Sequence, residues 1–580
     1  MAAMLERRWL TIHRETPAPG RRSDVARASP ITTLGRTAQP SAISLVLALC
    51  TMLGLVLRLY QLHRPGYLLG VTEYDDGADF GSAIRFVHGV LPYRDFITVQ
   101  PPGITLLMAP AALFSYAVGT AKALAVGRIF TACAGAAAVM LGGLLVRHRG
   151  VLATTVTCGI LAVFPDAIAA AHTVLLEPWL VLFCLLGAVA VFDGDEFAAV
   201  PDGLRAQRRA QWRIPWRTQW RSLCRSRVVW GGAAFGFAGA IKVWAILPVL
   251  VIAVLCLPVP RRLVVFLGGV AIGFLAPVLP FALAAPRTFL DSVIVAQLVR
   301  VDAARASLWT RLSALTGLTD FTRLGDAAIL SVALAIAAVV VGCCAAASLA
   351  TRRPPPTLEA FALISTALVV TAFLWPDDFY YHYAGFFAPF LALAPALPLG
   401  RCAASVPLPG VRWWSGGLTC LVVLTLVGMS LVQTHAESLL IAGDPAAAAD
   451  RVIPPGACVL TDTVSLTVAA NRFDSDVPGC SAMVDGVGTD YTLSHGLNGV
   501  IGAGAVPAVE SAWLSAFEHA QYVWLSCAPA ASPLCGGSTN RRIPWTPAIT
   551  AYFFSHFEKV TTPGAPSGLY ERYTDTSPTR

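Results

Sequence analysis

Charged residues are scarce in this chain of 580 residues. Asp, Glu, Lys and Arg make up only 13% of it, whereas soluble globular domains carry about 25%. Hydrophobic residues make up 56%, and apolar runs recur from residue 41 to residue 432. Many of these runs approach or exceed the roughly 20 residues that cross a bilayer. The composition excludes an ordinary soluble fold and predicts a polytopic α-helical membrane protein.

The sequence lacks the patterns that indicate a nucleotide-phosphate loop, a zinc site or a nucleic-acid-binding surface. The chain has no Walker-type phosphate loop, and the glycines of "LGGVAIG" (267 to 273) are typical of helix packing or turns. None of the 14 cysteines has the spacing of a zinc site. The formal net charge of +8 does not indicate nucleic acid, because the arginines form short blocks between apolar runs, as in cytoplasmic loops. We expect no nucleic-acid partner, and we leave a divalent metal open as a cofactor.

Eleven apolar runs are candidate membrane spans. They cover residues 41 to 62, 128 to 146, 151 to 171, 174 to 192, 228 to 241, 244 to 260, 263 to 285, 326 to 350, 357 to 375, 384 to 400 and 413 to 432. A further run, 103 to 118, follows two prolines and contains Pro110. At about 1.5 Å per residue it reaches roughly 24 Å, which is short of a hydrocarbon core of about 30 Å. We therefore place it in the outer interface.

The basic loops support this placement. With eleven crossings and a cytoplasmic N-terminus, every short basic loop faces the cytoplasm, as the positive-inside rule requires. The inner loops are then residues 147 to 150, 193 to 227, 261 to 262, 352 to 356 and 401 to 412. Residues 1 to 40 are predicted to form a disordered basic cytoplasmic tail, and residues 433 to 580 lie on the opposite side. We expect a multi-pass protein of the cytoplasmic (inner) membrane.

The segment from 433 to 580 has the composition of a small extracytoplasmic α/β domain. Its strand-like runs are "ACVLTD" (457 to 462), "QYVWLS" (521 to 526) and "GLYERY" (568 to 573). Its cysteines are Cys458, Cys480, Cys527 and Cys535. An oxidising compartment permits two disulfides among them. Three pairings are possible, and we favour the one that joins Cys527 to Cys535.

The first outer loop, 63 to 127, carries two adjacent carboxylates, Asp75 and Asp76, just beyond the first apolar run. Farther along, residues 80 to 91 place their apolar side chains on one face of a helix, with Arg85 off that face. This pattern predicts an interfacial helix that lies along the outer membrane surface. A solvated loop would by itself explain the acidic pair, because ionisable groups become costly only deeper in the bilayer.

The stretch "YDDGADFGSAIRFVHGVLPYRDFITVQPPG" (74 to 103) resembles the first outer loop of the polyprenyl-phosphate-sugar-dependent GT-C glycosyltransferases. Protein O-mannosyltransferases and the aminoarabinose transferases of lipid A are examples. In that family an Asp-Glu or Asp-Asp pair is followed by an Ala-rich surface helix, a Gly, "PYRDF" and "PPG". Asp76 stands here in place of the Glu. The resemblance implies a GT-C-like transmembrane domain with its site at the outer face.

Three further stretches resemble the same family. "AGAIKVWAILP" (238 to 248) is similar to its segment with a lysine at an outer helix end, here Lys242. "HTVLLEPWL" (172 to 180) is similar to its second acidic site, here Glu177. "FYYHYAGFFAPFLAL" (379 to 393) resembles its later aromatic loop on the outer face. The resemblance extends, in order, over residues 41 to 432, which we expect to form a GT-C-like transmembrane domain.

Moving a sugar from a lipid phosphate to a hydroxyl needs a base for the hydroxyl proton and stabilisation of the departing phosphate. A carboxylate serves as the base where desolvation and a second acid raise its pKa, and no metal is strictly required. The resemblance implies that Asp75 and Asp76 are the catalytic acids, with Asp75 as the base and with Asp76 and Glu177 shaping the site. Lys242 meets a phosphate, pairs with an internal carboxylate or snorkels to the surface, since a lone buried ammonium is expensive.

The remaining candidates for substrate binding have two interpretations each. Tyr381 and His382 either stack on sugar or lipid or belong to an aromatic belt. Asp95 either contacts substrate together with Arg94 or pairs with it to hold the loop. His172 could bind substrate or a metal, but one His and one Glu make a poor ligand set, which favours a hydrogen-bonded histidine at a helix end.

These observations predict a membrane glycosyltransferase that takes a hexose or pentose, such as mannose or arabinose, from a polyprenyl-phosphate carrier. The acceptor is expected to be a glycan, lipid or protein of the cell envelope, and the resemblance implies inverting transfer. A transporter or lipid-glycan flippase would instead place ionisable residues near the bilayer midplane and show an internal repeat. The candidate acids cluster toward one face, and no repeat is visible. A GT-C-like scaffold without catalysis is the third alternative.

Overall fold

The computed structural model describes residues 39–192, 226–301, 305–319, 324–376, 379–405, 444–481, 483–526 and 542–573, with scattered positions between 417 and 439. The predicted basic tail (1 to 40) and basic loop (193 to 227) lie largely outside these residues, and the last predicted span (413 to 432) is described only in part. Six helices of the described part are long and apolar enough to cross a membrane. They are α1 (Gln39–His63), α5 (Thr120–Val146), α12 (Pro260–Ala284), α16 (Asp326–Thr351), α17 (Thr357–Leu374) and α18 (Tyr383–Ser405). The chain is a multi-pass helical membrane protein.

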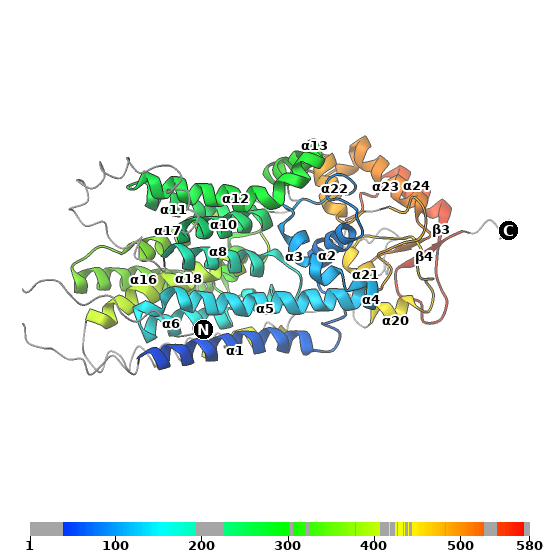
Figure 1. Cartoon of the computed structure of the whole chain (residues 1–580). Coiled ribbons are helices and arrows are strands. Elements are labelled where there is room, and N and C mark those ends of the chain that lie inside the picture. Colours follow the sequence, from blue (N-terminus) through cyan, green and yellow to red (C-terminus); the bar gives the residue numbers. More distant parts are fainter. Residues whose placement is uncertain are drawn as a thin grey trace, which may run out of the picture.

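Shorter apolar helices lie among the long ones (Figure 1). They are α6 (Val151–Val163), α8 (Leu176–Phe192), α10 (Arg227–Ile241) and α11 (Ile246–Cys256). Each is shorter than the roughly 20 residues that span a bilayer unaided. The predicted number of eleven crossings therefore stays a prediction.

Small residues bring α10 and α12 into close contact. A Cβ built on Gly236 of α10 would lie 2.1 Å from the carbonyl O of Val270, and one on Gly273 of α12 would lie 2.0 Å from the carbonyl O of Ala233. Substituting either glycine would therefore push the two backbones apart. Close approach through glycine is the usual way in which membrane helices pack, because lipid tails are as apolar as leucine and give no hydrophobic drive between helices.

Helix α2 (Tyr74–Val87) carries the acidic pair. Asp75 and Asp76 lie in its first turn, where the positive end of the helix dipole favours carboxylates. Every residue from Asp76 to Ile84 is buried, because α2 packs against both α3 (Gly103–Ala112) and α21 (Val464–Ala469). Protein therefore encloses residues 76–84 of this segment, whereas Arg85 to His88 are only partly buried; its position along the outer membrane surface stays a prediction.

A four-stranded sheet forms the core of the C-terminal domain. The strands are β1 (Val459–Thr461), β2 (Tyr522–Trp524), β3 (Phe557–Lys559) and β4 (Leu569–Arg572), in the order β1-β2-β4-β3. The β1–β2 pair is parallel and the other two pairs are antiparallel. The described helices of the domain are α20 (Pro445–Ala449), α21, α22 (Gly486–Leu493), α23 (Pro507–His519) and α24 (Pro547–His556). The three strand-like runs of the sequence contain β1, β2 and β4.

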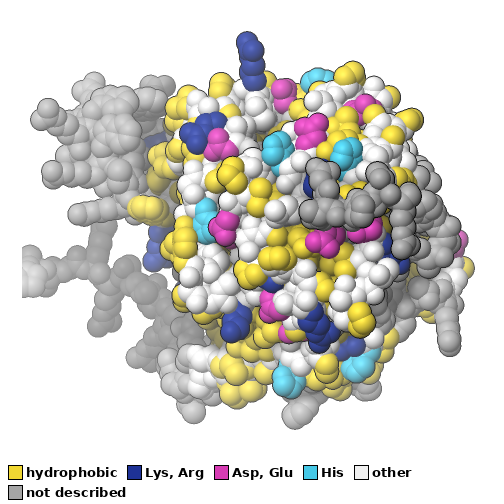
Figure 2. All heavy atoms as spheres, turned by 90° about the vertical axis from the view of Figure 1, so that its right-hand side faces the viewer, with side chains coloured by type: hydrophobic (Ala, Val, Ile, Leu, Met, Phe, Trp, Pro, Cys, Tyr) yellow, Lys and Arg dark blue, Asp and Glu magenta, His cyan; other side chains and the backbone are white. Residues whose placement is uncertain are grey.

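The two ends of the molecule have different surfaces. Helices of the bundle expose large apolar side chains, such as Val264, which is 70% exposed, and Leu349, which is 79% exposed. The end formed by the C-terminal domain instead shows acidic, basic and histidine side chains scattered between apolar ones (Figure 2). An apolar exterior suits lipid and a mixed, charged exterior suits water.

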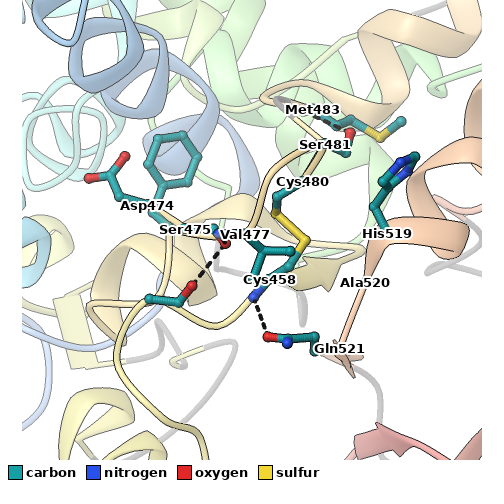
Figure 3. The surroundings of a disulfide bond; sticks show 12 residues. Cys458, Asp474, Ser475, Val477, Cys480, Ser481, Met483, His519, Ala520 and Gln521 are labelled. Carbon is teal, nitrogen blue, oxygen red and sulfur yellow. Dashed lines mark hydrogen bonds between the residues drawn. A yellow bond between two sulfur atoms is a disulfide. The ribbon is translucent and has the colours of Figure 1, made fainter.

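A disulfide joins Cys458 to Cys480 in the C-terminal domain. Cys458 comes directly before β1, and its N–H donates to the Gln521 Oε1 atom at 3.2 Å (Figure 3). The bond therefore lies beside the first residues of the parallel pair β1 and β2. This pairing leaves Cys527 and Cys535 for each other, as the favoured pairing requires, but those two cysteines lie outside the described residues.

The C-terminal domain is docked directly onto α2. The Gly77 N–H donates to Ser465 Oγ at 2.9 Å, and the Ser465 hydroxyl donates to the carbonyl O of Glu73. A Cβ on Gly77 would lie 2.0 Å from the backbone N of Ser465, so only glycine permits this approach. The docking fixes the position of α21 against the helix that carries Asp75.

Candidate active site

A cavity of about 440 Å³ lies where the helical bundle meets the C-terminal domain. Its walls come from α2, the start of α8, the end of α10, the aromatic loop 380–383 and the C-terminal domain. Its acidic lining residues are Glu73, Asp75, Asp79, Glu177 and Asp485, and its basic ones are Lys242, Arg300, His382 and Arg542. A space of this size suits a small-molecule or cofactor-sized ligand.

Asp75 and Asp79 line this cavity from the same face of α2, because residues four apart on a helix lie one above the other. The Asp75 side chain is exposed to the cavity, whereas Asp79 is only 5% exposed. Burial, together with the neighbouring charge of Asp75, raises the pKa of Asp79 well above its ordinary value. Asp79 was not among the predicted site residues, although its spacing from Asp75 was a readable signal.

Asp76 lies on a different side of α2, because consecutive residues of a helix are about 100° apart. Its carboxylate forms a fully buried ion pair with Arg128 of α5, and its Oδ1 accepts the Val174 N–H at 2.8 Å. Arg128 also donates to backbone carbonyl oxygens of the segment 67–70. Asp76 does not line the cavity. Its predicted catalytic role is therefore corrected to a structural one, which is to hold α2 against α5.

Glu177 and Lys242 form a buried ion pair at the cavity. Lys242 Nζ lies 2.5 Å from Glu177 Oε1, and His382 Nδ1 lies 3.0 Å from the same oxygen. The ammonium also lies 4.6 Å from the ring centroid of Trp244 and 4.4 Å from that of Tyr383, within the range of a cation–π contact. Of the interpretations open for Lys242, the structure shows the pair with an internal carboxylate.

The aromatic loop faces the cavity. All four of its residues, Tyr380 to Tyr383, are lining residues. The Tyr381 hydroxyl donates to Glu73 Oε1 at 2.7 Å, which ties the loop to the start of α2. The rings of Tyr380 and His382 stack with their centroids 5.6 Å apart. This placement favours the interpretation of Tyr381 and His382 as site residues over that of an aromatic belt.

The C-terminal domain supplies a wall that the sequence did not predict. Asp485 caps α22, and its Oδ1 accepts the Tyr74 hydroxyl at 2.9 Å and the Gly488 N–H at 2.7 Å. Burial raises the pKa of Asp485 to about 6. The Arg542 guanidinium lies 4.6 Å from the ring centroid of Tyr74 and donates to Thr463 Oγ1. No local motif marks these residues, because their role arises only where the domain docks.

Three predicted substrate-binding residues do not join the cavity lining. Arg94 and Asp95 form an exposed ion pair with each other, with Nε to Oδ1 at 2.9 Å, and the Leu91 N–H donates to Asp95 Oδ2 at 2.7 Å. They therefore hold their own loop. His172 is buried beside Tyr67, with ring centroids 6.4 Å apart. It forms no metal site with Glu177, since no group of three or more potential ligands occurs among the residues that the structure describes.

Comparison with known proteins gives matches in structure but not in sequence. No protein-family model matches the chain, and no curated protein matches it significantly. The chain is similar to ArnT from Cupriavidus metallidurans in the apo state, with a TM-score of 0.48 and 18% identity, over 74% of this chain and 85% of that one. It is similar to the archaeal oligosaccharyltransferase AglB from Archaeoglobus fulgidus, with a TM-score of 0.49 and 13% identity, over 83% of this chain and 69% of that one.

A third similar structure is the S. cerevisiae protein O-mannosyltransferase Pmt1–Pmt2 complex bound to its sugar donor. Here the TM-score is 0.28 and the identity 18%, over 46% of this chain and 36% of that one. Two of these three similar proteins are named as sugar-transferring enzymes. Because the identities do not exceed 18% and the TM-scores do not exceed 0.49, we base the function on the residues around the cavity.

Proposed function

We propose that this chain is a glycosyltransferase of the GT-C type, which moves a hexose or pentose from a polyprenyl-phosphate carrier to a hydroxyl of a cell-envelope glycan, lipid or protein. The observation that carries this proposal is one shared cavity, in which the exposed carboxylate of Asp75 faces the same space as Lys242 and His382. A base for a hydroxyl proton and fixed N–H donors for a phosphate are the groups that such a transfer needs.

Asp75 acts as the general base in this proposal. Its carboxylate takes the proton of the acceptor hydroxyl while the hydroxyl oxygen forms a bond to the anomeric carbon of the donor sugar. The bond between that carbon and the phosphate oxygen breaks, and polyprenyl phosphate leaves with the electron pair. Attack from the face opposite the phosphate inverts the anomeric configuration. Among the acidic residues of α2, Asp75 is the one whose side chain is exposed to the cavity.

The donor phosphate is assigned to the part of the cavity beside Lys242. Lys242 and His382 both reach the same Glu177 oxygen, so their nitrogen atoms are held in place before the donor arrives. The rings of Trp244 and Tyr383 flank the ammonium. Donors that are fixed beforehand stabilise a developing charge without the cost of reorganising. The pair with Glu177 keeps the lysine compensated while the site is empty.

We place the cavity and the C-terminal domain on the extracytoplasmic side of the cytoplasmic membrane, with the N-terminus inside. The Cys458–Cys480 disulfide supports this side, because disulfides persist in oxidising compartments. The positive-inside distribution of the arginine blocks supports it independently. A lipid-linked donor suits this side, since nucleotide sugars are confined to the cytoplasm.

A transfer assay on membranes tests the proposal. Membranes that contain the full chain receive radiolabelled polyprenyl-phosphate mannose or polyprenyl-phosphate arabinose, and label is followed into envelope material. We expect Asp75→Asn to lower transfer by about 10²- to 10⁴-fold, the usual contribution of a general base, with unchanged membrane insertion. The control is Asp326→Asn, an exposed acid in the first turn of α16, which should transfer at the wild-type rate.

Two outcomes would contradict the proposal. Sugar transfer by the Asp75→Asn variant at the wild-type rate would contradict the assignment of Asp75 as the general base. Movement of the intact lipid-linked sugar across the membrane, without transfer of label to an acceptor, would instead indicate a flippase.

A further inference from the structure

We infer that Asp79, one helical turn beyond Asp75 on α2, is a second substrate-contacting residue, which binds a hydroxyl of the donor sugar as a neutral, hydrogen-bonding carboxyl group. This inference rests on the proposed function and goes beyond it. It assigns sugar recognition to one acid of α2 and proton removal to another.

The spacing on α2 places Asp79 suitably for this role. Asp75 and Asp79 both line the cavity, and four residues of α-helix advance about 6 Å. That distance is comparable with the size of one sugar ring. A sugar whose anomeric carbon lies near Asp75 can therefore present a ring hydroxyl to Asp79. The ion pair of Lys242 and Glu177 lines the same cavity. The donor phosphate is assigned to the space beside this ion pair.

The surroundings of Asp79 indicate a carboxyl group without a charge partner. Asp79 Oδ2 is buried and has no hydrogen-bond partner within the described part of the chain. The Lys242 ammonium is already in an ion pair with Glu177. An ionised carboxylate that is buried without a partner is very costly, so such a group takes up a proton instead. The raised pKa of Asp79 agrees with this argument from geometry.

Asp76 provides the contrast on the same helix. Its carboxylate is also buried, but Arg128 and the Val174 N–H satisfy it. A structural role explains Asp76 completely, whereas no residue of the described chain satisfies Asp79 Oδ2. A buried polar atom that lacks a protein partner and belongs to a lining residue of a cavity is suited to a ligand.

A neutral carboxyl group matches a sugar hydroxyl, because each of them both donates and accepts a hydrogen bond. Asparagine has nearly the same size and keeps both capacities, whereas leucine has a similar size and keeps neither. The two substitutions therefore separate hydrogen bonding from shape. They also separate Asp79 from Asp75, since a general base cannot be replaced by an amide.

Binding to the full chain in detergent tests the inference without requiring transfer. The probes are polyprenyl-phosphate mannose, polyprenyl-phosphate arabinose and sugar-free polyprenyl phosphate. We expect Asp79→Leu to weaken binding of a sugar-bearing lipid by about 10-fold, as the loss of one good hydrogen bond does, and to leave binding of sugar-free polyprenyl phosphate unchanged. Asp79→Asn should bind all probes within about 3-fold of the wild type, because its amide keeps the hydrogen bond.

The outcomes separate this inference from the proposed function. Equal weakening of sugar-bearing and sugar-free lipids in Asp79→Leu overturns the inference alone. A folded Asp79→Asn variant that has lost selective binding of the sugar-bearing lipid also overturns it, even where the leucine variant folds poorly. A wild-type chain that binds none of the three lipids overturns the proposed function and the inference together.

Discussion

Lys242 and Glu177 hold each other inside the protein, with Nζ 2.5 Å from Oε1 and side chains that are 8% and 1% exposed. The lysine follows the last residue of α10, and the glutamate lies in the first turn of α8. The pair therefore joins two helices at the cavity. Each charge compensates for the burial of the other, so removing Lys242 leaves Glu177 with only its His382 contact, and removing Glu177 leaves Lys242 without a carboxylate.

Lys242→Met should destabilise the protein by up to about 3–5 kcal/mol, the usual cost of breaking a buried ion pair, because Glu177 keeps only its contact with His382. The double variant Lys242→Met/Glu177→Leu should be more stable than Lys242→Met, because it also removes the buried carboxylate that has lost its lysine partner. Thermal unfolding in detergent measures both. Arg94→Ala is the control, since the exposed Arg94–Asp95 pair should contribute no more than about 1 kcal/mol. Equal stability of Lys242→Met and the control would contradict the burial of the pair.

Asp76→Asn should destabilise the protein, whereas Asp75→Asn should not. Asp76 and Arg128 form a pair with both side chains 0% exposed, so the substitution leaves the arginine uncompensated at a cost of about 3 kcal/mol or more. Asp75 is exposed, and its substitution should change stability by no more than about 0.5 kcal/mol. Unfolding curves of the two variants, compared with their transfer activities, separate a structural acid from a catalytic one. The same stability loss in both variants would refute this separation.

Gly77→Ala should separate the C-terminal domain from α2. The new Cβ would lie 2.0 Å from the Ser465 backbone, and overpacking of this kind costs about 1–3 kcal/mol or more. Sugar transfer should fall although Asp75 is intact, and hydrogen exchange should rise in both α2 and α21. Gly268→Ala is the matched control, because a Cβ there meets nothing within 4 Å. Wild-type exchange in α21 of the Gly77→Ala variant would show that the contact does not hold the domain.

Asp490 should make the C-terminal domain less stable as the pH rises. Its Oδ1 accepts the Trp513 Nε1–H at 2.8 Å, its Oδ2 has no partner in the described chain, and burial raises its pKa to about 8. The folded state therefore holds the proton more tightly than the unfolded state, whose aspartate pKa is about 3.9. The stabilisation is complete below about pH 4 and is lost as the pH rises to about 8.

Asp490→Asn tests this pH dependence, because the amide oxygen can still accept from Trp513. We expect the variant to be more stable than the wild type at pH 8, by about 1 kcal/mol or more, and the difference to shrink toward pH 4. Chemical unfolding of the C-terminal domain across this range measures it. A difference that is independent of pH would show that Asp490 does not titrate in this window.

Some site residues could be read from the sequence because local context marked them. Lys242 and Glu177 were visible as single charges in apolar stretches, where a buried ion needs a partner. Asp75 was visible through the stretch around it. Asp76 was visible through the same stretch. Because α2 begins at Tyr74, both acids are helical, and their side chains point in directions about 100° apart around the helix axis. Adjacency in the sequence is therefore a poor guide to a shared site when the pair lies on a helix.

Other site residues carried no signal of their own. Asp485 and Arg542 reach the cavity only because the C-terminal domain docks through Gly77 and Ser465. Arg94 and Asp95 had two interpretations in the sequence, and the structure shows them paired with each other on their own loop. A one-residue spacing lets two opposite charges meet locally, and no long-range contact is then needed to explain them.

By itself, the sequence determined that this protein lies in a membrane, which segments form its long helices and where its strand-like runs fall. These properties depend on the length and periodicity of apolar runs, which are local features of the chain. The tertiary structure alone decided which acidic side chains line the cavity and which form ion pairs. It also decided that protein encloses residues 76–84 of α2. These outcomes depend on contacts between residues that lie between 52 and 388 positions apart in the sequence, such as Asp76 with Arg128 and Gly77 with Ser465. No local pattern predicts such a contact.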